Sequence, residues 1–147
     1  MCGEENIAGL QTRFYVEDGV VKATLKPREH HCGYPNTVHG GVVAAILDET
    51  MGWAASCAIK RMCLTADLQV RYVNRAPADR ATTVTTEVLR AGNRLVHVKS
   101  TLTGGDGEVF ASAEGRFVPL SIEETLHVDD HLIYRGGELR VFDELRG

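Results

Sequence analysis

The alternation of apolar and polar residues near the N-terminus predicts a hairpin of two short strands. Apolar side chains alternate with polar ones in "RFYVED" and "VVKATLKP", and Asp18-Gly19 stands between the two runs. Asp-Gly in this position is a favoured hairpin connection because both residues accept a positive φ. A loop rich in Pro, Gly, Asn and His is predicted to follow, from Pro27 to Val38.

One long helix and four more strands are predicted after the loop. The helix is expected from about His39 to Ala58, and "KR" follows it, where positive charge suits the end of a helix dipole. Runs rich in Val and Thr, bounded by turn residues, predict strands near 63–74, 81–90, 94–103 and 108–118. Two strands, one helix and then a meander of four strands indicate a single α+β domain.

The predicted helix carries unusually small side chains and two adjacent carboxylates. At 3.6 residues per turn one face collects six residues: Gly41, Ala44, Ala45, Asp48, Gly52 and Ala55. Glycine inside a helix costs about 1 kcal/mol relative to alanine, so we expect close packing along this face to compensate. Glu49 is rotated by about 100° from Asp48, towards the side of Trp53. Asp48 on the small face is therefore a candidate functional residue, and the alternative is an ordinary surface aspartate.

The triplet His39-Gly40-Gly41 opens the helix and adds a second candidate group. Free N–H groups at a helix start, with the positive end of the dipole behind them, suit an oxygen that gains negative charge. A glycine there lets that oxygen approach closely. A helix-terminal donor and a carboxylate about two turns further on form a candidate catalytic pair.

Composition and charge limit the classes of partner. The chain has 147 residues and a net charge of −4, which argues against a nucleic-acid binder. Residues 60–99 contain eight Lys or Arg against three acidic residues, so this stretch suits an anionic small molecule, or else solvated strand edges. We expect a cytoplasmic protein without membrane segments, and four free thiols, because no signal-like or long apolar run and no C-x-x-C pair occurs.

Two stretches together resemble a known family. "VHGGVVAAILDETMGWA" followed by "LTADLQVRYVNRAPA" is similar to the hotdog-fold acyl-CoA thioesterases of the phenylacetate-pathway type. The resemblance covers residues 12–118, leaving an N-terminal extension at 1–11 and a tail of uncertain packing at 119–147. It implies a hotdog fold, with a long central helix wrapped by an antiparallel sheet. It also implies homodimers that often pair into tetramers, with active sites at the dimer interface.

The resemblance assigns roles to individual residues. Asp48 falls on the nucleophile or general base that attacks the thioester, and Gly40 on the N–H that polarises its carbonyl. His39 would order the loop, and Thr65 falls on a hydroxyl that holds the attacking water near the carboxylate across the dimer interface. Glu49 stays an alternative: the catalytic carboxylate itself, a group that tunes Asp48, or a member of a structural ion pair. Asp67, two residues after Thr65, is expected on the same strand face.

The loop before the motif departs from many relatives. They carry an asparagine six residues before the motif histidine and a glycine three before it, whereas this chain has Gly33 and Asn36 in those positions. This leaves open which loop side chain, if any, assists the carbonyl. The basic residues Arg75, Arg90 and Arg94 are weaker candidates for contacts with the phosphates of coenzyme A.

The predicted function is hydrolysis of an acyl-CoA to a free acid and coenzyme A, with no cofactor or metal. The alternative is a hotdog domain that binds acyl-CoA or a related ligand without turning it over. A dehydratase of this fold would need a differently placed histidine. A metal site is a further alternative in one loop, at His30, His31, Cys32 and His39, but adjacent positions cannot all face one ion and the spacing fits no standard structural site.

Overall fold

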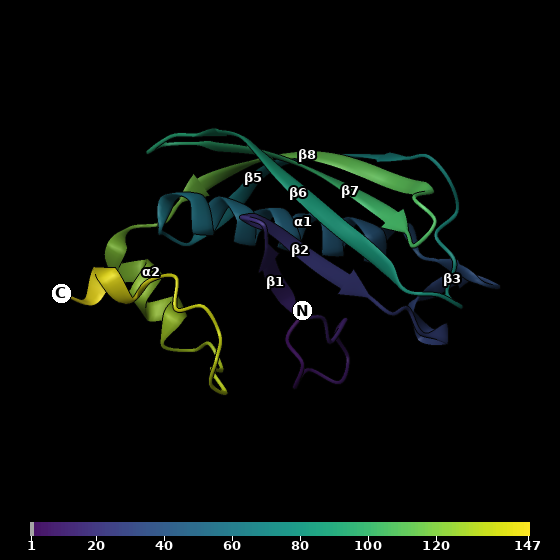
Figure 1. The fold of residues 1–147 in the computed structure, drawn as a ribbon, viewed down its shortest axis with the longest axis horizontal. Coiled ribbons are helices and arrows are strands. Elements are labelled where there is room, and N and C mark those ends of the chain that lie inside the picture. The colour runs from purple at the N-terminus through teal and green to yellow at the C-terminus, as the bar shows by residue number, and fades with distance from the viewer. Residues whose placement is uncertain (1) are drawn as a thin grey trace.

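A computed structural model describes residues 2–147 as one antiparallel sheet of six strands beside one long helix (Figure 1). The order across the sheet is β1-β2-β6-β7-β8-β5. The strands are β1 (Phe14–Glu17), β2 (Val20–Leu25), β5 (Cys63–Tyr72), β6 (Thr82–Ala91), β7 (Val96–Gly104) and β8 (Val109–Pro119). The predicted hairpin is confirmed, and Asp18 and Gly19 adopt φ values of 51° and 78° in its turn. The four later strands are confirmed as well, each within about two residues.

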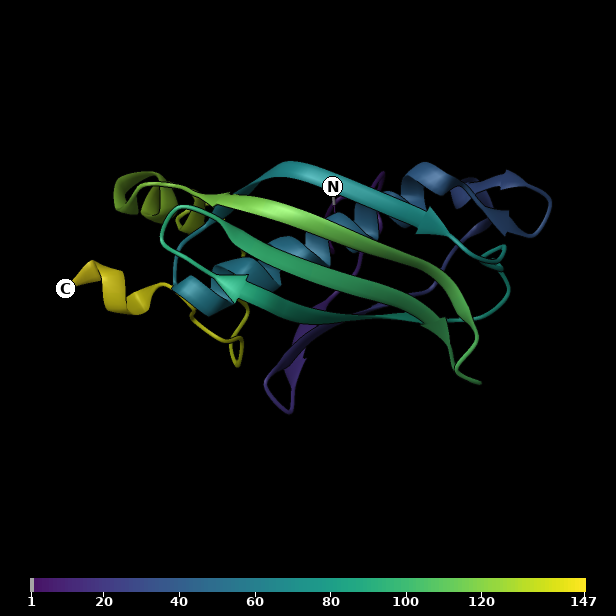
Figure 2. The ribbon, with the colours of Figure 1, turned by 90° about the horizontal axis from the view of Figure 1, so that it is seen from above.

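Helix α1 (Gly40–Ile59) lies along the concave face of the sheet, where β2, β5, β6, β7 and β8 pack against it (Figures 1 and 2). Most of its buried side chains lie at spacings of three and four residues, as expected for one helix face: Val43, Ile46, Leu47, Thr50, Met51, Ala54 and Ala55, with Ser56 also buried. They meet inward-facing residues of the strands, among them Val84, Val98 and Phe117. The α+β class and the hotdog arrangement are confirmed. By length and composition α1 would also suffice to cross a membrane, but core helices share this property and α1 occupies a core position.

The small helix face is closely packed only in part within one chain. The residues that α1 buries against the sheet are mainly the larger ones. Of the small face, Ala55 is buried, Ala44, Ala45 and Gly52 are partly buried, and Gly41 is exposed. A Cβ on Gly52 would find its nearest neighbour, the ring of Phe117, at an ordinary 3.7 Å. The small residues therefore leave one flank of α1 open instead of filling a tight contact within the chain.

The loop before α1 is short and ordered by hydrogen bonds. It contains a 3-10 turn η1 (Glu29–His31) and two short paired strands, β3 (Cys32–Tyr34) and β4 (Thr37–Val38). His31 is buried, and its carbonyl accepts a hydrogen bond of 2.8 Å from the N–H of His39. This contact fixes the residue that begins the helix.

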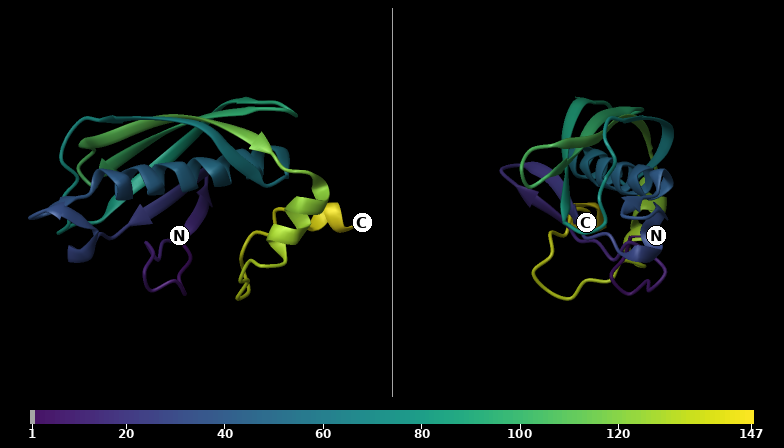
Figure 3. Two further views of the ribbon diagram at one scale, coloured as in Figure 1. Left: turned by 180° about the vertical axis from the view of Figure 1, so that it is seen from behind. Right: turned by 90° about the vertical axis from the view of Figure 1, so that its right-hand side faces the viewer.

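The C-terminal tail forms a small unit of its own, built from α2 (Ile122–Asp129) and η2 (Asp143–Arg146). The buried Asp129 accepts hydrogen bonds of 2.5 Å from both Tyr134 and Arg146. Burial alone would raise the pKa of Asp129, but these two donors outweigh it and lower that pKa. Figure 3 shows the tail and the N-terminal segment on the side of α1 away from the sheet, where Arg135 forms ion pairs with Glu4 and Glu5.

Candidate active site

The carboxylate of Asp48 meets a hydroxyl from the edge strand. The Oγ1 of Thr65 on β5 donates a hydrogen bond of 2.8 Å to Oδ1 of Asp48 on α1. Since this contact forms within one chain, the expectation that Thr65 reaches the carboxylate across a dimer interface is wrong. Asp48 is partly buried and Thr65 is exposed, so the pair lies at the border of the molecule. One oxygen of Asp48 remains available beside the open edge of the sheet.

A β-bulge makes this contact possible. Thr65 pairs with the inward-facing Phe117, and Asp67 with its outward-facing neighbour Arg116, so that Ala66 is the extra residue. Without the bulge, strict alternation from Asp67 would turn Thr65 to the outer face. The prediction that Thr65 and Asp67 share a face is therefore wrong: Thr65 faces the helix and Asp67 faces outward.

His39 caps the start of α1 through its side chain. The N–H of Gly41 donates a hydrogen bond of 2.9 Å to Nδ1 of His39, which therefore carries no proton there. The N–H groups of Val42 and Val43 bond to the carbonyl of His39. The N–H of Gly40 has no such partner among residues 2–147. It is the donor at the helix start that stays available to an outside oxygen.

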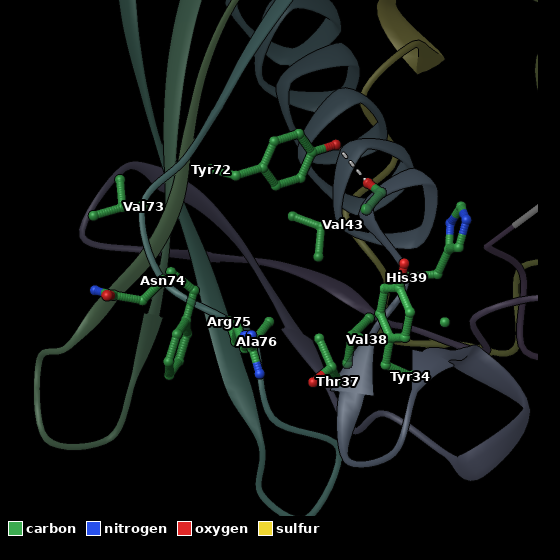
Figure 4. A pocket seen from close by; sticks show the side chains of 13 residues that line it. Tyr34, Thr37, Val38, His39, Val43, Tyr72, Val73, Asn74, Arg75 and Ala76 are labelled. Carbon is green, nitrogen blue, oxygen red and sulfur yellow. Dashed lines mark hydrogen bonds between the residues drawn. The ribbon is translucent and has the colours of Figure 1, made fainter.

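Tyr72, which sequence reasoning did not select, covers the same helix start. Its hydroxyl donates a hydrogen bond of 2.7 Å to the carbonyl of Gly40 (Figure 4). A Cβ on Gly40 would lie 3.3 Å from that hydroxyl, so the glycine permits this close approach. Gly40 and Tyr72, together with Arg75 and Tyr34, line a cavity of about 550 Å³. The alternation of β5 contained a signal for Tyr72, since it places this ring on the inner face near the end of the strand.

The donor and the carboxylate of one chain do not converge. Gly40 and Asp48 are eight residues apart on α1, which corresponds to roughly 12 Å along the helix axis. A nucleophile and an oxyanion donor must both lie about 3 Å from one carbonyl group. A single chain therefore holds two half-sites, one at each end of this stretch of helix.

Glu49 lies in different surroundings from Asp48. Among residues 2–147 it forms no ion pair, so the structural ion pair considered for it is absent there. Burial, and then the charge of Asp48, raise the pKa of Glu49 above its ordinary value. Burial and the nearby Glu49 in turn raise the pKa of the Cys2 thiol to about 12. Glu49 thus lies near the buried Cys2 of the N-terminal segment.

The three candidate arginines do not form one patch. Arg75 follows β5 at the Tyr72 end and lines the cavity. Arg90 lies near the end of β6 and Arg94 in the turn between β6 and β7, and the strand register places both at the Thr65 end of the sheet. Thr65 and Tyr72 are seven residues apart, roughly 23 Å along a strand. The structure therefore supports only Arg75 as a neighbour of the helix start within one chain.

Asn36 and Gly33, the loop residues in which this chain departs from many relatives, both have contacts that are structural. The side-chain oxygen of Asn36 accepts a hydrogen bond of 3.1 Å from the N–H of Ala78, so it is already used. A Cβ on Gly33 would lie 3.1 Å from the ring of His39, so a larger residue would press on the capping histidine. Within the described range 2–147, no three side chains of the ligand types His, Cys, Asp and Glu gather as they would around a metal ion.

Comparisons with known proteins give the family. The model of the thioesterase superfamily matches residues 35–111, more than half of the chain and the whole stretch from the loop before α1 into β8. The chain belongs to the thioesterase superfamily. The match contains His39, Gly40, Asp48, Thr65 and Tyr72.

Individual thioesterase-superfamily relatives agree with this assignment. Mouse acyl-coenzyme A thioesterase THEM4 is 30% identical over 99 residues, which is 66% of this chain and 42% of THEM4, so the chain spans less than half of that relative. The solved structure of protein RHA08564, a thioesterase superfamily protein, is 30% identical with a TM-score of 0.71, over 78% of this chain and 59% of that one. A hypothetical thioesterase from Streptococcus pneumoniae TIGR4, solved with coenzyme A, is 18% identical with a TM-score of 0.68, over 75% and 89%, and shows the same fold.

Proposed function

We propose that this protein hydrolyses an acyl-CoA thioester to a free acid and coenzyme A, with Asp48 as the catalytic carboxylate. The observation that carries the proposal is the hydrogen bond of 2.8 Å from Thr65 to Asp48 beside an open sheet edge. Membership in the thioesterase superfamily supports the reaction class. The name of the mouse relative and the coenzyme A bound to the streptococcal protein support acyl-CoA as the substrate.

The hydrogen bond between Thr65 and Asp48 sets the direction of proton transfer. Because Thr65 donates its only hydroxyl proton to Asp48, its oxygen acts towards a water molecule only as an acceptor. A water held by that oxygen and by the free oxygen of Asp48 would point both protons at acceptors and its lone pair at a carbonyl carbon. Asp48 takes one proton as the water attacks, the C–S bond breaks, and the proton passes to the departing thiolate.

Direct attack by Asp48 is a second route to the same products. It would form a mixed anhydride, release coenzyme A and then consume one water to restore the carboxylate. The Thr65 hydrogen bond favours the water route, because it occupies Oδ1 and holds the carboxylate in place for proton transfer.

The oxyanion donor is proposed to come from a second copy of the chain. The free N–H of Gly40 suits the carbonyl oxygen of the thioester, but Asp48 of the same chain is too far away to act on that carbon. A dimer that places the helix start of one copy beside Asp48 of the other would complete the site. Arg75, which lines the cavity at the helix start, is the proposed contact for a coenzyme A phosphate. Further pairing into tetramers stays a prediction.

Release of coenzyme A from a panel of aromatic and aliphatic acyl-CoAs tests the proposal. We expect turnover of at least one member by the wild type and none above background by Asp48→Asn, with both proteins folded. If the wild type binds acyl-CoA but releases no coenzyme A, the hotdog domain is a binding module and the proposal is wrong.

A further inference from the structure

His31 is a buried histidine in the loop before α1, with only 5% of its surface exposed. Its ring nitrogen Nε2 is buried without a hydrogen-bond partner among residues 2–147. Most buried polar groups in proteins are paired, because an unpaired one costs free energy. An apolar residue of similar size would avoid this cost, so packing alone does not explain a histidine at this position.

The other ring nitrogen of His31 closes the η1 turn. Nδ1 accepts a hydrogen bond of 3.1 Å from the N–H of Arg28, and the N–H of His31 donates one of 2.9 Å to the carbonyl of Arg28. The side chain of Arg28 also donates a hydrogen bond to Gln11, which joins the turn to the N-terminal segment. The ring and the backbone of His31 therefore hold the turn together.

The hydrogen bond from Arg28 requires a neutral ring. An Nδ1 that accepts a hydrogen bond carries no proton, so the proton of the neutral imidazole is on Nε2. Burial, and then the charges of His30 and Arg28, lower the pKa of His31 below its ordinary 6.5, and the nearby carbonyl of Gly9 opposes them in part. The neutral form, which can accept the hydrogen bond, therefore predominates at neutral pH.

The carbonyl of His31 connects this turn to the start of α1. It accepts a hydrogen bond of 2.8 Å from the N–H of His39, and Nδ1 of His39 accepts one of 2.9 Å from the N–H of Gly41. Gly40, whose N–H has no partner among residues 2–147, lies between these two bonded residues. The direction of the Gly40 N–H is therefore set by hydrogen bonds on both sides of it.

We propose that His31 is a positioning residue for the oxyanion donor. Its neutral ring holds the η1 turn, the turn places the carbonyl of His31, and that carbonyl places His39 and the N–H of Gly40. His31 itself touches no reacting atom, so the inference deepens the proposed function and rests on it. An oxyanion donor acts only at hydrogen-bond distance from the developing charge, so loss of the ring should lower kcat more than it changes KM.

Two variants of His31 separate hydrogen bonding from packing. His31→Asn keeps an acceptor at the position of Nδ1 but fills less space, whereas His31→Leu fills a similar space and leaves the N–H of Arg28 unpaired. We expect kcat to fall about tenfold in His31→Leu but no more than about twofold in His31→Asn, with KM within about twofold in both. His30→Asn, at the exposed neighbouring position, is the matched control and should behave as the wild type. If the folded leucine variant is at least as active as the asparagine variant, His31 serves packing and the inference is wrong.

Amide hydrogen exchange tests the positioning independently of catalysis. The amide of His39 bonds to the carbonyl of His31, so its exchange should become about tenfold faster in His31→Leu and stay near the wild-type rate in His31→Asn. The amide of Val98, in the centre of the sheet, is the internal control and should not change. Unchanged exchange at His39 in the leucine variant would overturn the inference. If the wild type turns over no acyl-CoA, the proposed function is wrong, and the exchange rates still decide whether His31 holds the start of α1.

Discussion

Asp48 and Glu49 are adjacent in the chain but lie in two different regions of the molecule. Asp48 lies beside the open edge strand, where Thr65 donates a hydrogen bond of 2.8 Å to it. Glu49 lies towards the N-terminal segment, near the buried Cys2, and no cation among residues 2–147 pairs with it. Both carboxylates are partly buried, but one residue step, about 100° around the helix, separates a carboxylate with a hydroxyl partner from one without such a partner among residues 2–147.

The two carboxylates differ in the groups that hold them. Burial raises the pKa of Glu49 because it destabilises the charged carboxylate. It does not provide a hydrogen-bond donor that would hold the carboxylate in one orientation. A raised pKa alone would favour Glu49 as the catalytic carboxylate. The geometry of the hydroxyl partner and the open border of the sheet favour Asp48.

Substitution of Asp48, the carboxylate to which Thr65 donates a hydrogen bond, should have the largest effect on rate. Asp48→Asn keeps the size and the hydrogen-bonding capacity of the side chain but removes the base, so kcat should fall by about 10²- to 10⁴-fold. Steady-state release of coenzyme A measures this loss. Retention of more than a tenth of the wild-type kcat in a folded variant would contradict the role of Asp48.

Removal of the partner hydroxyl should have a smaller effect. Thr65→Ala leaves the base but releases both the carboxylate and its water, and hydrogen bonds to charged groups of this kind correspond to about 10- to 100-fold in rate. Thr65→Ser, the matched control, keeps the hydroxyl and should stay within a few-fold of the wild type. Equal activity of the alanine and serine variants would show that the reaction does not depend on the hydrogen bond from Thr65 to Asp48.

Tyr72→Phe tests the other half-site. The ring stays in place while the hydroxyl that bonds to the Gly40 carbonyl is lost, so kcat should fall by about three- to tenfold. Because Tyr72 acts by positioning the helix start, KM should change less than kcat. A change confined to KM would instead indicate that the ring contacts the substrate.

Substitution of Glu49 should have the smallest effect on rate. Glu49→Gln should leave kcat within about twofold. Because the folded-state pKa of Glu49 is raised above its ordinary 4.5, the protein loses stability as pH rises from about 4.5 through the folded-state pKa. The glutamine variant should therefore melt slightly higher at pH 7, by at most about 2 °C, with no gain at pH 4. A variant with intact structure and no activity would identify Glu49 as the catalytic carboxylate.

Most of the fold followed from the sequence because its signals are local. Asp18-Gly19 marked the hairpin, and the apolar runs after Cys63 marked four strands that the structure confirms. The bulge at Ala66 carries no such signal, since no glycine or other unusual residue marks it, so the facing of Thr65 and Asp67 was mispredicted. The separation of Arg75 from Arg90 was also missed, because it depends on how four strands align across the sheet.

A mixture of two inactive variants tests the central claim, that Gly40 of one copy acts with Asp48 of the other. Gly40→Pro removes the free N–H, and proline suits the first helical position, after a residue at φ −59° and ψ 136°. Gly40→Ala, which crowds Tyr72 equally but keeps the N–H, is its control. Co-expression of Gly40→Pro with Asp48→Asn should restore about a quarter of wild-type activity, since half of the dimers then contain one intact site. If the mixture is as inactive as either variant alone although mixed dimers form, the two groups do not act across the interface.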